Sequence, residues 1–256
     1  MSRIKKLAVE AAEEAGRYAL LHMEKISKIA RKKGYNDLVT DVDRHCERII
    51  IKRIKKDFPD HSILAEESGG DTGDGGFCWI IDPVDGTTNY VHGFPFFCTS
   101  IGVMFEGAIS AGVVYDPSRR ELFSAEKNKG AFLNRNRINV SGMARVRDSL
   151  IATGFAYKAS GRTRGLTYFN RVLRHAQAIR RAGSAALDLC YAACGRFDGF
   201  WEFGLNPWDT AAGRLIVEEA GGTVTTLDGG PFDVFQKEIV ASNGKIHKEL
   251  LHLLNC

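Results

Sequence analysis

An acidic turn directly follows an apolar stretch in the first half of the chain. Residues 79–89 read WIIDPVDGTTN, so Asp82 and Asp85 stand three residues apart with Pro83 between them. Because proline has a fixed φ and no amide hydrogen, this segment can turn both carboxylates toward one point. Two facing carboxylates repel each other unless a proton or a cation lies between them. The following glycine and threonines offer backbone amides and hydroxyls that suit an anion, so the motif predicts a metal ion that bridges to phosphate.

Two distant segments also place a carboxylate at the end of an apolar element. Glu66 and Glu67 follow the apolar residues 63–65, and Asp209 lies near the third position of a helix predicted to begin at Pro207. One such acid alone is usually a turn residue, or a charge that favours a helix N-terminus by about 0.3–1 kcal/mol. Taken with the two aspartates of the turn, Glu66 and Asp209 predict a metal cluster. Oxygen ligands without histidine favour Mg²⁺ or Mn²⁺ over zinc.

Asp43 fits a capping box at the start of a second helix, predicted from Asp41 to about Phe58. In this pattern Thr40 is the N-cap and Asp43 is the third helical residue, and each side chain accepts a hydrogen bond from the other residue's backbone. Capping explains Asp43 without any catalytic role.

Four motifs together make the chain resemble the bacterial members of the inositol monophosphatase family, which are lithium-sensitive, Mg²⁺-dependent phosphatases. They occur in the family's order and spacing, and the resemblance covers nearly the whole chain. The motifs are Glu66-Glu67, residues 82–89 (DPVDGTTN), residues 180–189 (RRAGSAALDL), and Trp208-Asp209 with Gly221-Gly222 after it.

The resemblance implies a role for each matching residue. The catalytic residues would be Asp43, Glu66 and Thr87, with Asp43 accepting a hydrogen bond from the Thr87 hydroxyl that orients the attacking water. The metal ligands would be Glu66, Asp82, the carbonyl of Val84, Asp85 and Asp209. The substrate would contact Glu66, Val84, Asp85, Gly86, Thr87, Gly183, Ser184, Ala185, Glu202 and Asp209. Glu202 stands among aromatic residues and therefore needs a partner, either a polyol hydroxyl or an arginine.

The implied activity is hydrolysis of inositol monophosphate to myo-inositol and phosphate by two-metal-assisted attack of water. Transfer to water is expected because the chain has no Walker lysine, GxSxG elbow or catalytic cysteine context. Two alternatives stay open: an enzyme of the same superfamily that acts on fructose 1,6-bisphosphate or a nucleotide phosphate, and a non-enzymatic regulator that binds RNA or the transcription machinery. An arginine-rich stretch is either a solvated helical face or a surface that attracts anionic substrates, and it could supply the contacts that a second phosphate or a base needs. Its residues are Arg162, Arg164, Arg171, Arg174, Arg180 and Arg181.

Composition predicts a globular domain that folds without disulfide bonds. With 256 residues and 44% hydrophobic content, we expect a single domain over 1–256, with approximate halves 1–145 and 146–256. The basic N-terminus lacks a secretory apolar segment, and no apolar run reaches membrane-spanning length. The six cysteines lack metal-finger spacing, which favours reduced, buried thiols in a cytoplasmic protein. The family resemblance implies a homodimer.

The pattern of apolar residues predicts an α/β fold. Helices are expected over about 4–20 and 41–58, and the apolar runs within 63–133 predict an antiparallel sheet in the first half. The second half alternates, and that predicts a layered α/β unit. Its expected helices are 166–174, 185–194, 207–220 and one at the C-terminus, and its expected strands are 150–152, 199–203, 223–226 and 239–242. The resemblance implies that the whole is an αβαβα sandwich.

Overall fold

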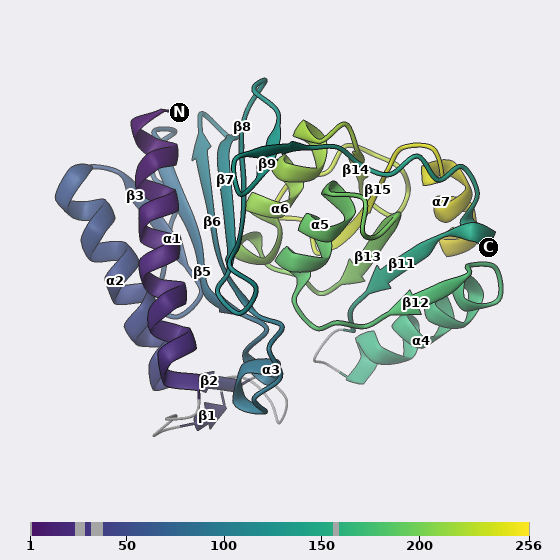
Figure 1. The fold of residues 1–256 in the computed structure, drawn as a ribbon, viewed down its shortest axis with the longest axis horizontal. Helices are drawn as coiled ribbons and strands as arrows, with labels where there is room; N and C mark the ends of the chain where they lie inside the picture. The colour runs from purple at the N-terminus through teal and green to yellow at the C-terminus, as the bar shows by residue number, and fades with distance from the viewer. Residues whose placement is uncertain (1, 24–28, 32–37, 156–158, 256) are drawn as a thin grey trace.

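The computed structural model has five layers in the order helix, sheet, helix, sheet, helix (Figure 1). It describes residues 2–23, 29–31, 38–155 and 159–255. The fold confirms the expected αβαβα sandwich, with a large sheet from the first half of the chain and a smaller one from the second half.

The outer helix layer consists of α1 (Arg3–His22) and α2 (Asp41–Asp57), which pack side by side against the large sheet. Both were predicted, because apolar residues recur along them at helical spacing. The α2 N-terminus has the expected capping box, in which Thr40 accepts from the amides of Val42 and Asp43. The face that α2 buries also includes Asp43 and Glu47.

The large sheet has eight strands in the order β10-β9-β8-β7-β6-β5-β3-β4. Its strands are β3 (Ser62–Ala65), β4 (Gly69–Gly70), β5 (Phe77–Asp85), β6 (Cys98–Phe105), β7 (Ala108–Asp116), β8 (Glu121–Glu126), β9 (Ala131–Leu133) and β10 (Asn136–Ile138). The expected antiparallel pairing holds except between β3 and β5, which run parallel. Parallel pairing brings the C-terminal ends of these two strands to the same edge, so Glu66 emerges next to the acidic turn.

The small sheet is mixed, with the order β12-β11-β13-β15-β14. Its strands are β11 (Leu150–Thr153), β12 (Ala178–Arg180), β13 (Gly199–Phe203), β14 (Thr223–Thr225) and β15 (Glu238–Ser242). The last helix layer, α4 (Ala159–Leu173) and α7 (His247–Asn255), covers its outer face. Residue 166 was expected to begin the helix that in fact starts at Ala159.

The helices α5 (Ala185–Ala193) and α6 (Pro207–Glu219) form the middle layer between the two sheets. Along β5, Cys78 and Ile80 belong to the core that contains these helices, whereas Trp79 and Ile81 belong to the core under α1 and α2. This alternation is the period of two that a strand with both faces covered must show. The N-termini of α5 and α6 therefore lie near the C-terminal end of β5.

Several short elements had no sequence prediction. They are β1 (Ile29–Arg31), β2 (Leu38–Thr40), β4, β10, β12, the helix α3 (Thr87–Val91) and the 3₁₀ turn Val146–Asp148. Cys46, Cys78, Cys98 and Cys190 are buried free thiols and Cys194 is half-buried, while Cys256 lies outside the described residues. Within the described ranges, none of the helices combines the length and apolarity that crossing a membrane would require.

Candidate metal and phosphate site

A β-bulge brings Asp82 and Asp85 together. In the pairing of β5 with β6, Asp82 lies opposite Ser100 and Asp85 opposite Cys98, so β5 has an extra residue at this point. In a regular strand, residues three apart point to opposite faces, and the bulge cancels that alternation. The bulge is held by Thr99, whose hydroxyl donates to the Pro83 carbonyl at 2.9 Å.

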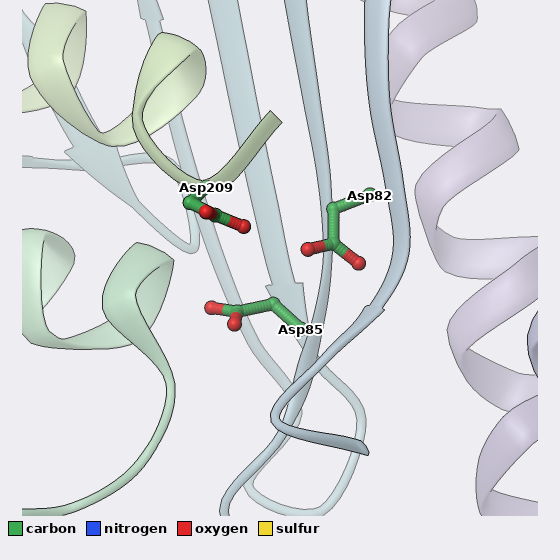
Figure 2. Close-up of side chains that lie close together, drawn as sticks. All are labelled: Asp82, Asp85 and Asp209. Carbon is green, nitrogen blue, oxygen red and sulfur yellow. The ribbon is translucent and has the colours of Figure 1, made fainter. Parts of the chain in front are cut away.

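Asp209 reaches the same point from the start of α6 (Figure 2). Oxygen atoms of Asp82, Asp85 and Asp209 lie within 4.8 Å of one another. Asp209 also accepts a hydrogen bond at 2.7 Å from the backbone amide of Asn206, the N-cap of α6, and Pro207 is the first helical residue as predicted. The predicted convergence of these three aspartates is therefore present in the structure.

Glu66 follows β3 in a turn beside this cluster, and its backbone amide donates to the Ile81 carbonyl at 3.1 Å. The charge of Glu66 contributes to the raised pKa of Asp82. The turn is supported by Glu47 of α2, whose side chain accepts a hydrogen bond at 2.8 Å from the Glu67 amide. Glu47 had no sequence prediction, although a charged residue on the buried face of α2 was a detectable signal.

Burial and mutual repulsion raise the pKa values in the cluster. The pKa of Asp82 lies well above its usual range because of burial and then the charges of Glu66, Asp85 and Asp209. Burial also raises the pKa of Asp209, followed by the charges of Asp85 and Glu66. Such a group of acids is costly unless a cation neutralises it. Carboxylate oxygens close enough to share one ion fit a hard divalent metal.

Gly86 ends the acidic turn and begins α3. It has a φ of +95°, and a Cβ there would meet the Phe96 carbonyl oxygen at 3.0 Å and the Gly183 carbonyl oxygen at 3.3 Å. Only glycine fits this conformation and this close approach comfortably. The first amides of α3, at Thr87 and Thr88, have no acceptor inside the helix, so they are free in principle to bind an anion.

Thr87 connects the acidic turn to α2. Its hydroxyl lies 3.2 Å from Asp43 Oδ1 and 3.1 Å from the Val84 carbonyl oxygen, and it can donate to one of them at a time. The other oxygen of Asp43 accepts from the Thr40 amide at 2.9 Å. Burial raises the pKa of Asp43 to about 6, although its bond with Thr40 lowers it. The capping contact and the Thr87 contact therefore coexist.

The N-terminus of α5 binds Asp85. Oδ2 of Asp85 accepts hydrogen bonds from the Ser184 hydroxyl at 2.6 Å and from the Ala186 amide at 2.8 Å. Burial raises the pKa of Asp85 to about 6 in spite of these bonds. Gly183 and Ala185 flank Ser184, so all three predicted residues of this segment border the acidic cluster.

A model of the inositol monophosphatase family matches residues 1–256. The chain belongs to this family. It is 48% identical over 252 residues to the inositol-1-monophosphatase of Synechocystis sp., covering 97% of this chain and 88% of that one. It is 44% identical over 250 residues to the Nus factor SuhB of Escherichia coli K12, covering 96% and 93%. The crystal structure of the extragenic suppressor protein suhB from Bartonella henselae superposes with a TM-score of 0.93 at 42% identity, covering 99% and 98%.

Glu202, the remaining residue of the family pattern, lies on β13. Burial raises its pKa to about 8, the charge of Arg181 lowers it and the charge of Asp85 raises it. A Cβ on Gly154 would stand 2.0 Å from the Glu202 carboxyl, so that glycine leaves the room that the side chain fills. Glu202 and Asp85 are thus within electrostatic reach of each other.

Some arginines of the arginine-rich stretch contact other parts of the protein, and others are exposed on its surface. Arg164 forms a salt bridge with Glu238 at 2.5 Å, and Arg171 donates to the Leu254 carbonyl at 3.2 Å. Arg180 and Arg181 are exposed just before α5. The Arg162 side chain is outside the described part of the protein.

Asn89 is a site residue whose role the sequence did not reveal. Its side-chain amide donates to the carbonyl oxygens of Phe96 and Ala182, both at 2.8 Å. Asn89 therefore links α3 to the loop before α5, and so fixes the acidic turn next to the segment 183–185. Its place in the DPVDGTTN motif was a signal that it matters, but its partners are distant in sequence.

Proposed function

We propose that this protein is a Mg²⁺-dependent phosphomonoesterase that hydrolyses inositol monophosphate to myo-inositol and phosphate, with Mn²⁺ as a possible substitute ion. The observation that carries the proposal is the convergence of Asp82, Asp85 and Asp209 beside the contact of Thr87 with Asp43. Membership of the inositol monophosphatase family supports a phosphatase, and the name of the Synechocystis relative supports inositol phosphate as the substrate.

In this proposal the acidic residues bind the metal, and Thr87 with Asp43 orients the attacking water. Mg²⁺ ions bound by Glu66, Asp82, the Val84 carbonyl, Asp85 and Asp209 would supply Lewis-acid activation of the attacking water and stabilise the leaving alkoxide. Asp43 accepts a hydrogen bond from the Thr87 hydroxyl, so the lone pairs of the Thr87 oxygen would accept a hydrogen bond from the attacking water. Fixing the direction of the nucleophile in this way lowers the entropic part of the barrier.

The remaining family residues would bind the two ends of the substrate. The amides of Gly86 and Thr87 would donate to phosphate oxygens at the start of α3. On the opposite side, Glu202 would accept hydrogen bonds from hydroxyls of the polyol, close to the turn from Gly183 to Ala185. This division separates recognition of the phosphate from recognition of the alcohol.

The test is phosphate release from a substrate panel in the presence of Mg²⁺. The panel contains inositol 1-phosphate, fructose 1,6-bisphosphate, nucleotide 2′- and 3′-phosphates, and p-nitrophenyl phosphate. We expect the highest kcat/KM on inositol 1-phosphate. A higher value on the bisphosphate or a nucleotide would replace the substrate assignment, and no release from any ester would refute the phosphatase proposal itself.

A second candidate function is regulation of transcription, which the Nus factor SuhB relatives favour. The exposed Arg180 and Arg181 give this surface a positive charge suited to nucleic acid. The two functions separate in an Asp85→Asn variant, because loss of catalysis should not affect a binding surface outside the acidic cluster. If that variant still co-purifies with RNA polymerase or RNA as the wild type does, the binding function is independent; if neither protein does, this candidate falls.

A further inference from the structure

The turn that follows β3 is bound by a carboxylate from another layer of the fold. Glu47 belongs to α2, lies on the face that this helix buries, and has only 4% of its surface exposed. Its Oε2 accepts a hydrogen bond at 2.8 Å from the backbone amide of Glu67. A buried carboxylate is unfavourable unless it accepts such bonds. The contact therefore joins the outer helix layer to the turn that contains Glu66.

The backbone is fixed on both sides of Glu66. On the N-terminal side, the Glu66 amide donates to the Ile81 carbonyl at 3.1 Å, which continues the parallel pairing of β3 with β5. On the C-terminal side, the next peptide unit carries the Glu67 amide that donates to Glu47. Because peptide units are planar, fixing the two units that flank a Cα atom also fixes the direction of its Cα–Cβ bond. The bond to Glu47 therefore helps to determine where the Glu66 side chain points.

This direction matters because Glu66 leaves the sheet beside Asp82. Ala65 pairs with Ile81, so the residues that follow them, Glu66 and Asp82, emerge at the same level of the two strands. A glutamate carboxylate lies at the end of a long side chain, so a small rotation at its Cα atom displaces it considerably. Groups that orient a metal ligand in this indirect way typically contribute about 10–100-fold to metal affinity.

Glu47 has a counterpart one helical turn earlier on the same buried face of α2. This residue is Asp43, whose Oδ1 lies 3.2 Å from the Thr87 hydroxyl. The two acids are four residues apart, or about 6 Å along the helix axis. One helix thus contacts both the acidic turn after β5 and the turn after β3. Its rigidity fixes the separation of the two turns.

We propose that Glu47 is a positioning residue which, through the Glu67 amide, orients Glu66 for metal binding. Its action is confined to the backbone of the turn. This inference rests on the proposed function, because Glu66 is one of the Mg²⁺ ligands in that proposal. What the mechanism requires at position 47 is an acceptor oxygen at the right place, and not a negative charge.

The first test measures Mn²⁺ binding by electron paramagnetic resonance in wild type, Glu47→Gln and Glu47→Met. Glutamine keeps an acceptor oxygen, whereas methionine keeps the length of the side chain but offers only a weak acceptor. We expect the Kd for Mn²⁺ to rise by about ten-fold or more in Glu47→Met and by less than about three-fold in Glu47→Gln. A wild-type Kd in Glu47→Met would overturn the proposal, and so would an equal loss in both variants.

Glu219→Met is the matched control. Glu219 is the last residue of α6, and it too accepts hydrogen bonds from backbone amides of a turn, those of Asn128 and Gly130, both at 2.6 Å. It lies about 15 Å along the helix from Asp209. This control should lower Tm and leave the Kd for Mn²⁺ as in wild type. If it weakens Mn²⁺ binding as much as Glu47→Met does, the loss reflects general destabilisation and the proposal fails.

A second measurement needs no variant, and so also decides the question if Glu47→Met does not fold. In metal-free wild-type protein, the Glu67 amide should exchange its hydrogen at least about ten-fold more slowly than an amide of an unfolded chain, as followed by nuclear magnetic resonance. Exchange at the unfolded rate would mean that Glu47 does not hold the turn before metal binds, and the proposal would be overturned.

Metal binding and hydrolysis are measured separately, so the two proposals can fail separately. If the wild type binds Mn²⁺ but releases phosphate from no ester, the proposed function falls, while the Kd values of the variants still decide the role of Glu47. If the wild type binds no Mn²⁺, this inference falls. If it binds Mn²⁺ and hydrolyses esters with no dependence on Glu47, only this inference falls.

Discussion

At the scale of single residues, two aspartates serve a helix and the site at once. Asp43 and Asp209 each occupy the third position of a helix, and each uses Oδ2 to accept from the backbone of the N-cap residue. A carboxylate has a second oxygen with its own lone pairs. In Asp43 that oxygen contacts Thr87, and Asp209 offers an oxygen to the acidic cluster. Capping and catalysis are therefore compatible interpretations of one residue.

Asp43→Asn tests the contact with Thr87. We expect turnover to fall by about ten-fold or more, because general-base assistance to the attacking water typically contributes about 10²–10⁴-fold. Stability should fall by no more than about 1 kcal/mol, the usual cost of a lost cap. The measurements are kcat at saturating Mg²⁺ and the free energy of unfolding by urea.

The control is Thr40→Ala, which removes the capping hydroxyl and its hydrogen bond to Asp43 Oδ2 but keeps the Thr40 amide that donates to the same oxygen. It should cost about 1 kcal/mol of stability and retain most of the rate. If Asp43→Asn retains wild-type turnover as well, Asp43 is a cap only.

At the scale of elements, glycines decide how closely α6 approaches the large sheet. A Cβ on Gly102 would stand 2.7 Å from Ala211 Cβ, and one on Gly112 would stand 2.7 Å from the Ala212 carbonyl oxygen. Both contacts involve small or backbone atoms that cannot swing aside. Because Asp209 is in the first turn of α6, this packing also sets its distance from Asp82.

Gly112→Ala should therefore affect both stability and the site. The methyl group pushes α6 away from the sheet, and overpacking of this kind costs about 1–3 kcal/mol. The displaced Asp209 should raise the Mg²⁺ concentration that gives half-maximal activity. Gly76→Ala is the control, since a Cβ there meets nothing within 4 Å. Wild-type Mg²⁺ dependence in Gly112→Ala would show that α6 can adjust without moving the ligand.

His247 at the start of α7 predicts a pH dependence of stability. Its Nδ1 lies 2.8 Å from the Ser242 hydroxyl and its Nε2 lies 2.9 Å from the Thr225 hydroxyl, and burial lowers its pKa below the ordinary 6.5. Below pH 6.5 the unfolded chain binds a proton that the folded state binds only at lower pH, so stability falls as pH falls through that window.

The change is at most about 1.4 kcal/mol per pH unit for this group. It should be measured as the difference in unfolding free energy between about pH 7.5 and about pH 5.5. His247→Gln, which does not titrate, should show a smaller loss on acidification than the wild type. An equal loss in both proteins would assign the effect to other groups.

At the scale of the whole molecule, elements from both halves end at one point. The ends of β3 and β5 and the N-termini of α5 and α6 all deliver polar groups there, while α2 supplies Asp43 from the outer layer. The fold thus concentrates negative charge in its interior. A cation bound among these buried acids would offset their repulsion, so metal binding would stabilise the folded state.

Mg²⁺ should therefore raise the Tm of the wild type relative to protein in EDTA. Binding to the folded state alone contributes about 2.7 kcal/mol at a concentration 100 times Kd. Asp85→Asn should keep the fold, lose nearly all turnover and show a much smaller shift, because it removes one negative charge and weakens one ligand. A full Mg²⁺ shift in Asp85→Asn, or none in the wild type, would contradict a metal site at this cluster.

The sequence alone determined features that depend on neighbouring residues. The capping box at Thr40, the start of α6 at Pro207 and the long helices follow from local spacing, and so were predictable. The acidic ends of β3, β5 and α6 could also be identified, because each follows or begins an apolar segment. Short strands such as β4, β10 and β12 were missed, since two or three residues have too little periodicity to detect.

Tertiary structure decided what depends on residues far apart in the chain. The parallel pairing of β3 with β5 brings Glu66 next to the C-terminal end of β5, and the bulge in β5 turns Asp82 and Asp85 toward each other. Packing of α5 against the acidic turn brings the Ser184 hydroxyl within hydrogen-bonding distance of Asp85. No local pattern specifies these approaches, because they arise from the joint burial of both sheets around the middle helices.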